Sequence, residues 1–247
     1  MSQRLKLIIA YDGAPFGGWQ SQKHRNTIQD RLECAFRRIG GNYLRVHGAG
    51  RTDAGVHALA QCAHVDVPDR RLTAESWKNA LNAGLPATIR ILRCEYVSPD
   101  FHARFSVKRK TYRYRIWAGP VLPPLELNRA WHIPISLDVD LIRAAGKQLV
   151  GKHDFAAFAA NRGKREENTV RTISSLAIRK RGPDLTIEVT GDGFLYKMVR
   201  IIVGSMVRVA IGKMEVREVT VGLESGESTN ARSVAPSCGL YLMKVWY

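Results

Sequence analysis

Hydrophobic and polar residues along the chain follow two different periods, one typical of helices and one typical of strands. Between positions 28 and 39 the apolar residues recur at helical spacing. Asn26 or Thr27 can cap this helix, and Gly40-Gly41 can end it. Elsewhere short β-rich runs end at Gly, Pro or Asp, as residues 5–11 end at Asp12, and these runs predict strands.

These patterns predict a mixed set of elements. The predicted strands cover residues 5–11, 43–46, 61–67, 89–97, 110–117, 172–180, 185–190 and 240–247. The predicted helices cover residues 28–39, about 73–83, 138–149, 196–211 and 216–223. Asp138 caps the third helix, and its apolar residues Leu141, Ile142, Ala145 and Leu149 are expected to point inward. Strands 172–180 and 185–190 form a hairpin around Gly182-Pro183.

The elements fall into two sets with a similar order of strands and helices. A chain of 247 residues is long enough for one large domain or two small ones. We therefore expect an α+β fold with two lobes, residues 1–105 and 106–247, that share a sheet and leave a cleft between them.

The charge balance of the chain points to a polyanionic partner. Lys and Arg total 38 against 22 Asp and Glu, so the formal net charge is +16. A basic surface for anionic lipid, or a basic protein that is merely soluble, would show the same total. Nucleic acid is favoured because the cations are interleaved with aromatic residues and do not form one tail.

Cysteine spacing and hydropathy indicate a cytoplasmic protein. The four cysteines lie far apart without a C-x-x-C pair, which disfavours a zinc site or a disulfide framework and fits a reducing compartment. The apolar run near the start is too short for a signal peptide. The longest apolar stretch, residues 199–211, is interrupted by Arg208 and cannot span a membrane.

The segment Gly48-Ala-Gly-Arg-Thr-Asp-Ala-Gly-Val-His57 is the strongest local feature. Its glycines permit left-handed backbone and the close approach of a ligand. Arg51 and Asp53 are two residues apart, so an extended backbone places both side chains on one side and favours an ionised, nucleophilic carboxylate. A structural turn, with Asp53 as its cap and Arg51 neutralising it, explains the spacing as well, and spacing alone favours that turn.

Other chemistries fit this segment poorly. It lacks the G-K-[ST] ending of a phosphate-binding P-loop. His57 and His64 have no neighbouring acidic cluster, so a metal site is not expected. A glycosidase needs two carboxylates beside one bond, and the next acids lie beyond the following strand. One carboxylate without a metal or redox cofactor leaves few reactions.

Basic and aromatic residues alternate over residues 101–115. In a strand, Tyr112 and Tyr114 share one face while Arg113 and Arg115 share the other. Aromatic rings stack on bases splayed from RNA, and guanidinium groups bind phosphates. The alternative is an amphipathic edge strand with tyrosine in the core and arginine in solvent, and we expect it to hold for one of the two tyrosines.

The helix predicted over residues 196–211 is apolar nearly all round and should be buried. The exception is a stripe along one side of the helix, formed by Arg200, Gly204 and Arg208. Gly204 in this stripe allows another backbone to approach. Arg208 most simply extends to solvent. Arg200 is the better candidate for pairing with a buried carboxylate.

Six motifs, in order, resemble those of the bacterial tRNA pseudouridine synthases of the TruA class, over nearly the whole chain. They are Tyr11-Asp-Gly with Gly18-Trp-Gln20, Gly50-Arg-Thr-Asp-Ala-Gly-Val-His57, Lys110-Thr-Tyr-Arg-Tyr114, Gly151-Lys-His-Asp-Phe155, Met198-Val-Arg-Ile201 with Gly204, and Ala235-Pro with Gly239-Leu-Tyr241. The second is highly specific for the family. Departures from the family pattern are small. Phe16 replaces a usual tyrosine, and Ala60 and Cys62 differ from the pattern in the segment after the loop.

The resemblance implies a role for each of five residues. Asp53, in the N-terminal lobe, would be the nucleophile. Tyr112 would stack on the flipped base and could take part in proton transfer. Arg200 would pair with Asp53 and hold it ionised. Arg51 would help to extrude the nucleotide, and Leu240 would form a wall of the pocket.

The resemblance also implies the fold, substrate and assembly. The fold would be that of a pseudouridine synthase with a mainly antiparallel central sheet. The substrate would be tRNA, at uridines 38 to 40 of the anticodon stem-loop, and the enzyme would be a homodimer that needs no cofactor or metal. A non-catalytic RNA-binding protein on the same fold is the main alternative, and a metal-dependent ribonuclease is disfavoured by the missing acidic cluster.

Overall fold

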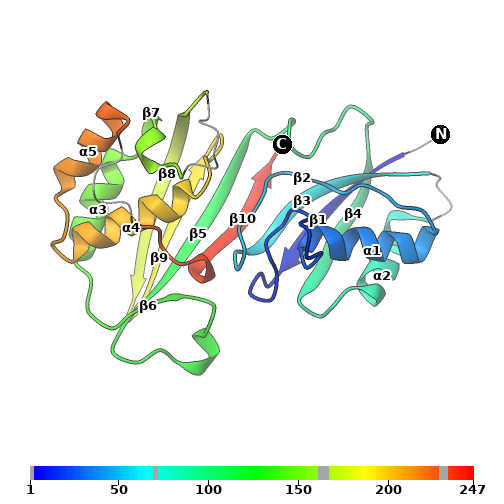
Figure 1. Cartoon of the computed structure of the whole chain (residues 1–247), viewed down its shortest axis with the longest axis horizontal. Helices are drawn as coiled ribbons and strands as arrows, with labels where there is room; N and C mark the ends of the chain where they lie inside the picture. The colour runs from blue at the N-terminus through cyan, green and yellow to red at the C-terminus, as the bar shows by residue number, and fades with distance from the viewer. Residues whose placement is uncertain (1–2, 69–71, 161–166, 228–232) are drawn as a thin grey trace. The chain divides into compact units, whose positions relative to one another are not determined.

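The computed structural model describes residues 3–68, 72–160, 167–227 and 233–247 (Figure 1). These residues form two compact units. The first unit holds Met1–Lys108 and Tyr241–Tyr247, and the second holds Arg109–Leu240. The end of the chain therefore belongs with the first unit.

The first unit is a sheet with two helices. Its strands are β1 (Gln3–Tyr11), β2 (His47–Gly48), β3 (His57–Val67), β4 (Ile89–Val97) and β10 (Leu240–Trp246), and its helices are α1 (Ile28–Gly40) and α2 (Ala74–Gly84). The strands run in the order β4-β1-β3-β10, with β2 also paired to β3. Pairing is antiparallel except between β3 and β10, which are parallel.

Local sequence accounts for these elements. In β1 every second residue is buried, because successive side chains of a strand point to opposite faces. Thr27 caps α1 by accepting a hydrogen bond from the Asp30 N–H, and Gly41 ends it in the left-handed conformation. Helices α1 and α2 cover one face of the sheet, where the rings of Phe36 and Trp77 lie 5.4 Å apart (Figure 1).

The second unit has a similar composition of elements. Its strands are β5 (Arg109–Ala118), β6 (Trp131–Ile133), β7 (Gly151–Asp154), β8 (Val170–Arg181) and β9 (Asp184–Gly191). Its helices are α3 (Val139–Gln148), α4 (Met198–Ala210) and α5 (Val216–Ser225), with short 3-10 turns at Pro124–Glu126, Ala156–Phe158 and Ser237–Gly239. The strand order is β5-β9-β8-β7, antiparallel throughout, and β6 lies parallel to β5.

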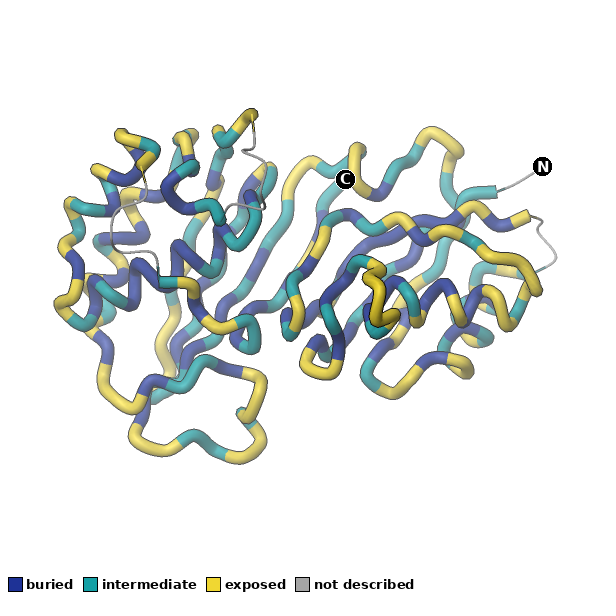
Figure 2. The backbone as a smooth tube through the Cα atoms, viewed as in Figure 1, coloured by how far each residue is buried: buried dark blue, intermediate teal, exposed yellow. Residues whose placement is uncertain are grey.

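Helix α4 is the core of the second unit. Nearly every residue along it is buried, as its apolar sequence predicts (Figure 2). Its neighbours α3 and α5 lie on the same side of the sheet (Figure 1). None of the helices in the described ranges is long and apolar enough to cross a membrane.

The predicted α+β class and its mainly antiparallel pairing are confirmed, as are the hairpin of β8 and β9 and the positions of all five helices. The strand predicted over residues 43–46 is wrong. The Val46 N–H and the Tyr43 hydroxyl both donate to the Glu33 carboxylate, so this segment is tied to a side chain and only β2 pairs with the sheet. Strand β3 begins at His57, earlier than predicted. The inward orientation of Leu141 is also wrong, since it is 37% exposed.

Candidate active site

The candidate loop connects β2 to β3, and its first two residues are hydrogen-bonded to β3. The Ala49 N–H donates to the Cys62 carbonyl (2.8 Å), and the Gln61 amide donates to the Gly50 carbonyl (2.9 Å). Further along the loop, the Val56 N–H donates to the Asp53 carbonyl (3.2 Å) and closes a turn in which Gly55 has a φ of +79°. This turn needs a residue that tolerates positive φ, which explains the glycine.

Thr52 is held through both its backbone and its side chain. Its carbonyl accepts from the Trp19 N–H (3.0 Å), and its hydroxyl lies 2.8 Å from the Tyr11 hydroxyl in a buried hydrogen bond. Burial raises the pKa of the Tyr11 phenol, so this group stays neutral and able to donate. The residue directly before Asp53 therefore has little freedom to move.

Two glycines bring residues 11–20 against this loop. Gly18 has a φ of +94°, and a β-carbon there would lie 2.6 Å from the Thr52 carbonyl oxygen. At Gly13 a β-carbon would collide with the Val56 carbonyl. The motif Tyr11-Asp-Gly with Gly18-Trp-Gln20 thus has a structural reason, because its backbone packs directly on the candidate loop.

Burial alternates along the three central residues of the loop. Arg51 is exposed, Thr52 is buried and Asp53 is half-buried. This alternation is typical of an extended backbone, in which Arg51 and Asp53 share the side opposite Thr52. The turn is present and the burial pattern is compatible with both side chains lying on one side, so the two interpretations of the loop do not exclude each other.

His57 ends the loop and joins it to the last strand. Its Nδ1 accepts from the Gly13 N–H (3.1 Å), and its ring stacks on Tyr241 with centroids 4.7 Å apart. Tyr241 is also the residue that pairs with His57 in the β3–β10 ladder. Leu240, 6% exposed, directly precedes Tyr241.

In the second unit, both tyrosines of β5 are buried. Tyr114 is fully buried and donates to the Pro236 carbonyl (2.6 Å), so the core interpretation holds for it, and the burial of Tyr112 fits that interpretation as well. Tyr112 is 8% exposed and lies edge-on to Phe194, with ring centroids 5.2 Å apart.

Two arginines of β5, Arg113 and Arg115, are paired with acids of their own unit. Arg113 donates to Glu188 (2.7 Å), and Arg115 donates to Glu126 (2.8 Å) and Asp184 (3.3 Å). Their charges are thus largely balanced within the protein. This arrangement favours the amphipathic-strand interpretation for their face of β5.

Arg200 lies on α4 and is bound to the segment near the C-terminal motif. Its Nε donates to the Ala235 carbonyl (2.7 Å), and its own carbonyl accepts from the Ala235 N–H (3.1 Å). A β-carbon at Gly204 would collide with the Ser233 carbonyl, which confirms the predicted close approach of another backbone. Arg208 donates to the Lys213 carbonyl (3.2 Å) beyond the helix end.

The sequence places the residues that support the loop in its motifs but does not reveal their supporting role. Thr52, Tyr11, Trp19 and Gly18 carry no chemistry that marks a reactive site, and their contacts join distant parts of the chain. The signal in the sequence was their place in the first two of the six motifs. Arg51, Thr52 and Asp53 lie together in the first unit, whereas Tyr112, Arg200 and Leu240 belong to the second.

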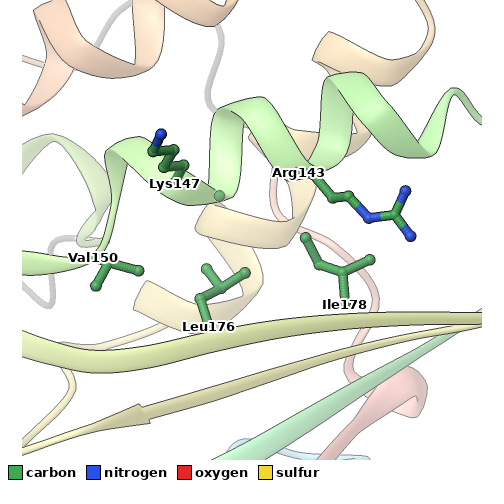
Figure 3. Close-up of a pocket in the computed structure, with 6 residues that line it drawn as sticks. Arg143, Lys147, Val150, Leu176 and Ile178 are labelled. Carbon is green, nitrogen blue, oxygen red and sulfur yellow. The ribbon is translucent and has the colours of Figure 1, made fainter.

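A hollow of about 260 Å³ in the second unit lies away from these residues (Figure 3). Leu176 and Ile178 point from β8 toward α3, and Arg143, Gly146, Lys147 and Val150 complete the lining. The amino group of Lys147 points away from the strand, and Arg143 is paired with Asp140 (2.7 Å). None of the predicted site residues lines this hollow. Within the described ranges, no group of three or more His, Cys, Asp or Glu could hold a metal ion.

Known proteins resemble this chain over nearly its whole length. The family model described as tRNA pseudouridine synthase matches residues 7–106 and 145–247. The tRNA pseudouridine synthase A of Akkermansia muciniphila is 45% identical, covering 99% of this chain and 95% of that relative. Those of Methylacidiphilum infernorum (43%; 98% and 94%) and a Thermoanaerobacter species (40%; 99% and 100%) are similar.

The family match includes every residue of the candidate loop, together with Arg200 and Leu240. Tyr112 lies between the two matched ranges. None of these comparisons supports a non-catalytic RNA-binding protein. On this evidence the chain belongs to the tRNA pseudouridine synthase family.

Proposed function

We propose that Asp53 is the nucleophile with which this enzyme isomerises uridine to pseudouridine in tRNA. The observation that carries the proposal is the fixed backbone around a half-buried carboxylate. Hydrogen bonds from Trp19 and Tyr11 hold Thr52, and the turn hydrogen bond from Val56 holds the Asp53 carbonyl. A nucleophile held in one geometry loses little freedom when it reacts.

The reaction needs little beyond this carboxylate. The N-glycosidic bond of the uridine breaks, the base turns, and C5 of the base joins the sugar at C1′. The hydrogen on C5 leaves as a proton and N1 gains one, so substrate and product are isomers. No electrons are exchanged with an outside oxidant or reductant. A base inside a helix must first be flipped out, at a cost of a few kcal/mol.

Four other residues are proposed to complete the site. Arg51, exposed beside Asp53, helps to extrude the target nucleotide. Tyr112 stacks on the flipped base, and Arg200 pairs with Asp53 and favours its ionised form. Leu240 forms an apolar wall. Residues 1–105 are proposed to carry the nucleophile, and residues 106–247 to complete the site, with 241–247 belonging to the first unit.

We propose that the targets are uridines 38, 39 and 40 of the anticodon stem-loop. The protein is proposed to act in the cytoplasm as a homodimer. The +16 net charge supports a partner as acidic as a folded tRNA.

Site mapping tests the target. Three anticodon stem-loops, each with a single uridine at position 38, 39 or 40, are incubated with the enzyme, and pseudouridine is located by carbodiimide adducts and primer extension. Conversion of these uridines is expected, and a stem-loop with its single uridine at position 32 is the control. Conversion at position 32 alone would contradict the proposed target.

Sedimentation tests the assembly. A homodimer is expected at micromolar concentration, with and without the stem-loop. A monomer under both conditions would contradict the proposal. This result would leave the proposed role of Asp53 intact.

A further inference from the structure

The turn that follows β4 is attached firmly to the first unit. The Ala103 carbonyl accepts from the Tyr247 hydroxyl (2.8 Å), and the Ala103 N–H donates to His64 Nδ1 (3.1 Å). His102 and Ser106 close the turn on each other through backbone and side-chain hydrogen bonds of 2.9 and 3.0 Å. A side chain presented by this turn is therefore held on a rigid support.

Phe105 is presented to solvent by this turn. Its side chain is 77% exposed, against 61% for Tyr43, the next most exposed aromatic residue in the described part of the chain. Exposing a ring of this size to water is unfavourable, and no part of the described chain covers it. An exposed aromatic ring on a rigid turn fits a binding role better than a packing role.

A row of imidazole rings packs against Phe105. His102 lies 4.3 Å from Phe105 between ring centroids, His64 lies 4.6 Å from His102, and His47 lies 4.9 Å from His64. The Nδ1 of His102 accepts from the N–H groups of Arg104 (3.1 Å) and Phe105 (3.3 Å), which fixes the orientation of its ring. Burial lowers the pKa of His102 and lowers that of His64 to about 4, so both rings are neutral at physiological pH.

Arg104 supplies a cation beside the exposed ring. Its guanidinium carbon lies 5.7 Å from the centroid of Phe105. Arg104 forms no ion pair with a carboxylate of the described residues, in contrast to Arg113 with Glu188 and Arg4 with Asp66. A charge left unbalanced beside an aromatic face suits a ligand that offers a phosphate and a flat ring together.

We propose that Phe105 and Arg104 form an accessory RNA subsite, in which Phe105 stacks an unpaired nucleobase of the tRNA and Arg104 binds the adjoining phosphate. A nucleotide carries a flat base with a phosphate next to it on the backbone. Aromatic rings and arginines together recognise single-stranded RNA in this way. The subsite is separate from the candidate loop in sequence and does not depend on the identity of the nucleophile.

A second copy of the chain is a less suitable occupant. Stable interfaces bury on the order of 1,200 Å² or more around an apolar centre. Here a single exposed ring is bordered by the charged Arg104 and the polar His102. The charge of this border complements RNA, whereas a copy of the same basic chain would repel it.

Substitutions at Phe105 test the stacking. We expect Phe105→Ala to raise the Kd for an anticodon stem-loop about tenfold and to raise KM similarly, with kcat changed less than about twofold. Phe105→Trp is expected to bind as tightly as the natural protein, and its fluorescence to fall on addition of RNA. Phe105→Leu keeps apolar surface without a ring and is expected to resemble Phe105→Ala. Because Phe105 is exposed, these variants are expected to fold like the natural protein, and circular dichroism checks this.

A charge variant and a matched control complete the experiment. Arg104→Gln is expected to weaken binding and to reduce the slope of log Kd against log salt by about one. Leu125→Ala removes a side chain that is 87% exposed in the second unit. This variant is expected to change neither the Kd for RNA nor KM. Unchanged RNA affinity in Phe105→Ala, or a dimer that dissociates while RNA affinity holds, would overturn the proposal. Full affinity in Phe105→Leu would also overturn it, because stacking requires a ring.

Discussion

The hydroxyl of Tyr11 and the hydroxyl of Thr52 lie 2.8 Å apart in a buried hydrogen bond that joins the first strand to the residue before Asp53. Forty-one positions separate the two residues in the sequence. Through this contact, strand β1 helps to fix the geometry of the Asp53 carboxylate. Its removal should affect both stability and turnover.

Thr52→Val is expected to lower the free energy of unfolding by about 1–3 kcal/mol, because the Tyr11 hydroxyl is left buried beside a methyl group. The same variant is expected to lower kcat about tenfold or more, since the backbone before Asp53 gains freedom, with RNA affinity unchanged. Denaturant unfolding and steady-state kinetics measure the two effects. Thr52→Ser keeps the hydroxyl and should restore most of both. Equal kcat in Thr52→Val and the natural protein would show that this contact does not position the carboxylate.

Gly18→Ala is expected to lower kcat strongly because its β-carbon would lie 2.6 Å from the Thr52 carbonyl, at a φ of +94°. Gly40→Ala is the matched control, since a β-carbon there has no neighbour within 4 Å. Kinetics and thermal unfolding of the two variants should diverge clearly. A Gly18→Ala protein with normal turnover would mean that the close backbone approach has no influence on the loop.

Arg51→Gln is expected to lower kcat/KM about tenfold to a hundredfold, since base extrusion loses a contact that offsets unstacking. Arg113→Gln should change kcat/KM less than about twofold, because Glu188 already balances the Arg113 charge. Breaking that partly exposed pair should cost about 0.2–1 kcal/mol of stability. Equal losses of kcat/KM in both variants would indicate that the site does not distinguish the two arginines.

Stability is expected to decrease as the pH falls from about 6.5 to about 4, through His64. Burial, together with the charges of Arg4, His102 and His47, lowers the folded-state pKa of His64 from 6.5 to about 4. The unfolded chain therefore binds a proton first, so the contribution is complete above pH 6.5 and is lost as the pH falls through the folded-state pKa. We expect a loss of about 1–2 kcal/mol after allowance for screening by nearby solvent.

The variant His64→Asn isolates this effect, because its carbonyl can accept from the Ala103 N–H without titrating. Denaturant midpoints at pH 7, 5.5 and 4.5 should decrease for the natural protein and decrease less for the variant, in which His102, whose pKa is also lowered by burial, still titrates. The lowered pKa of Asp66, held by its hydrogen bonds with Arg4, acts at lower pH and should remain in both proteins. Parallel pH profiles in this range would exclude His64 as the source.

Local patterns in the sequence predict the long elements well. Thr27, Thr73 and Asp138 cap helices where the hydrophobic period begins, and glycine ends α1 where the period stops. Strands β6 and β7 were missed because a segment of three or four residues is too short to show alternation. Leu141 follows the helical period but lies on the edge of the buried face, which periodicity alone does not resolve.

In the candidate site, the residues that the sequence predicts are clearly separated from those that it does not. Asp53 and Arg51 could be named from the sequence because a charged pair between glycines is a local signal. The support beneath them could not, because hydrogen bonds such as Tyr11 to Thr52 and Trp19 to Thr52 depend on which strands become neighbours. The pairing of β10 with β3, which places Tyr241 on His57, depends likewise on topology.

The most direct test of the central claim is tritium release from tRNA carrying C5-labelled uridine, with Asp53→Asn beside the natural protein, in the presence of EDTA. The natural protein is expected to release tritium under these conditions, and Asp53→Asn to release none above background. The variant should bind tRNA with nearly unchanged affinity, because phosphate contacts supply most of the binding. Appreciable release by Asp53→Asn, or loss of release by the natural protein on chelation, would contradict the account.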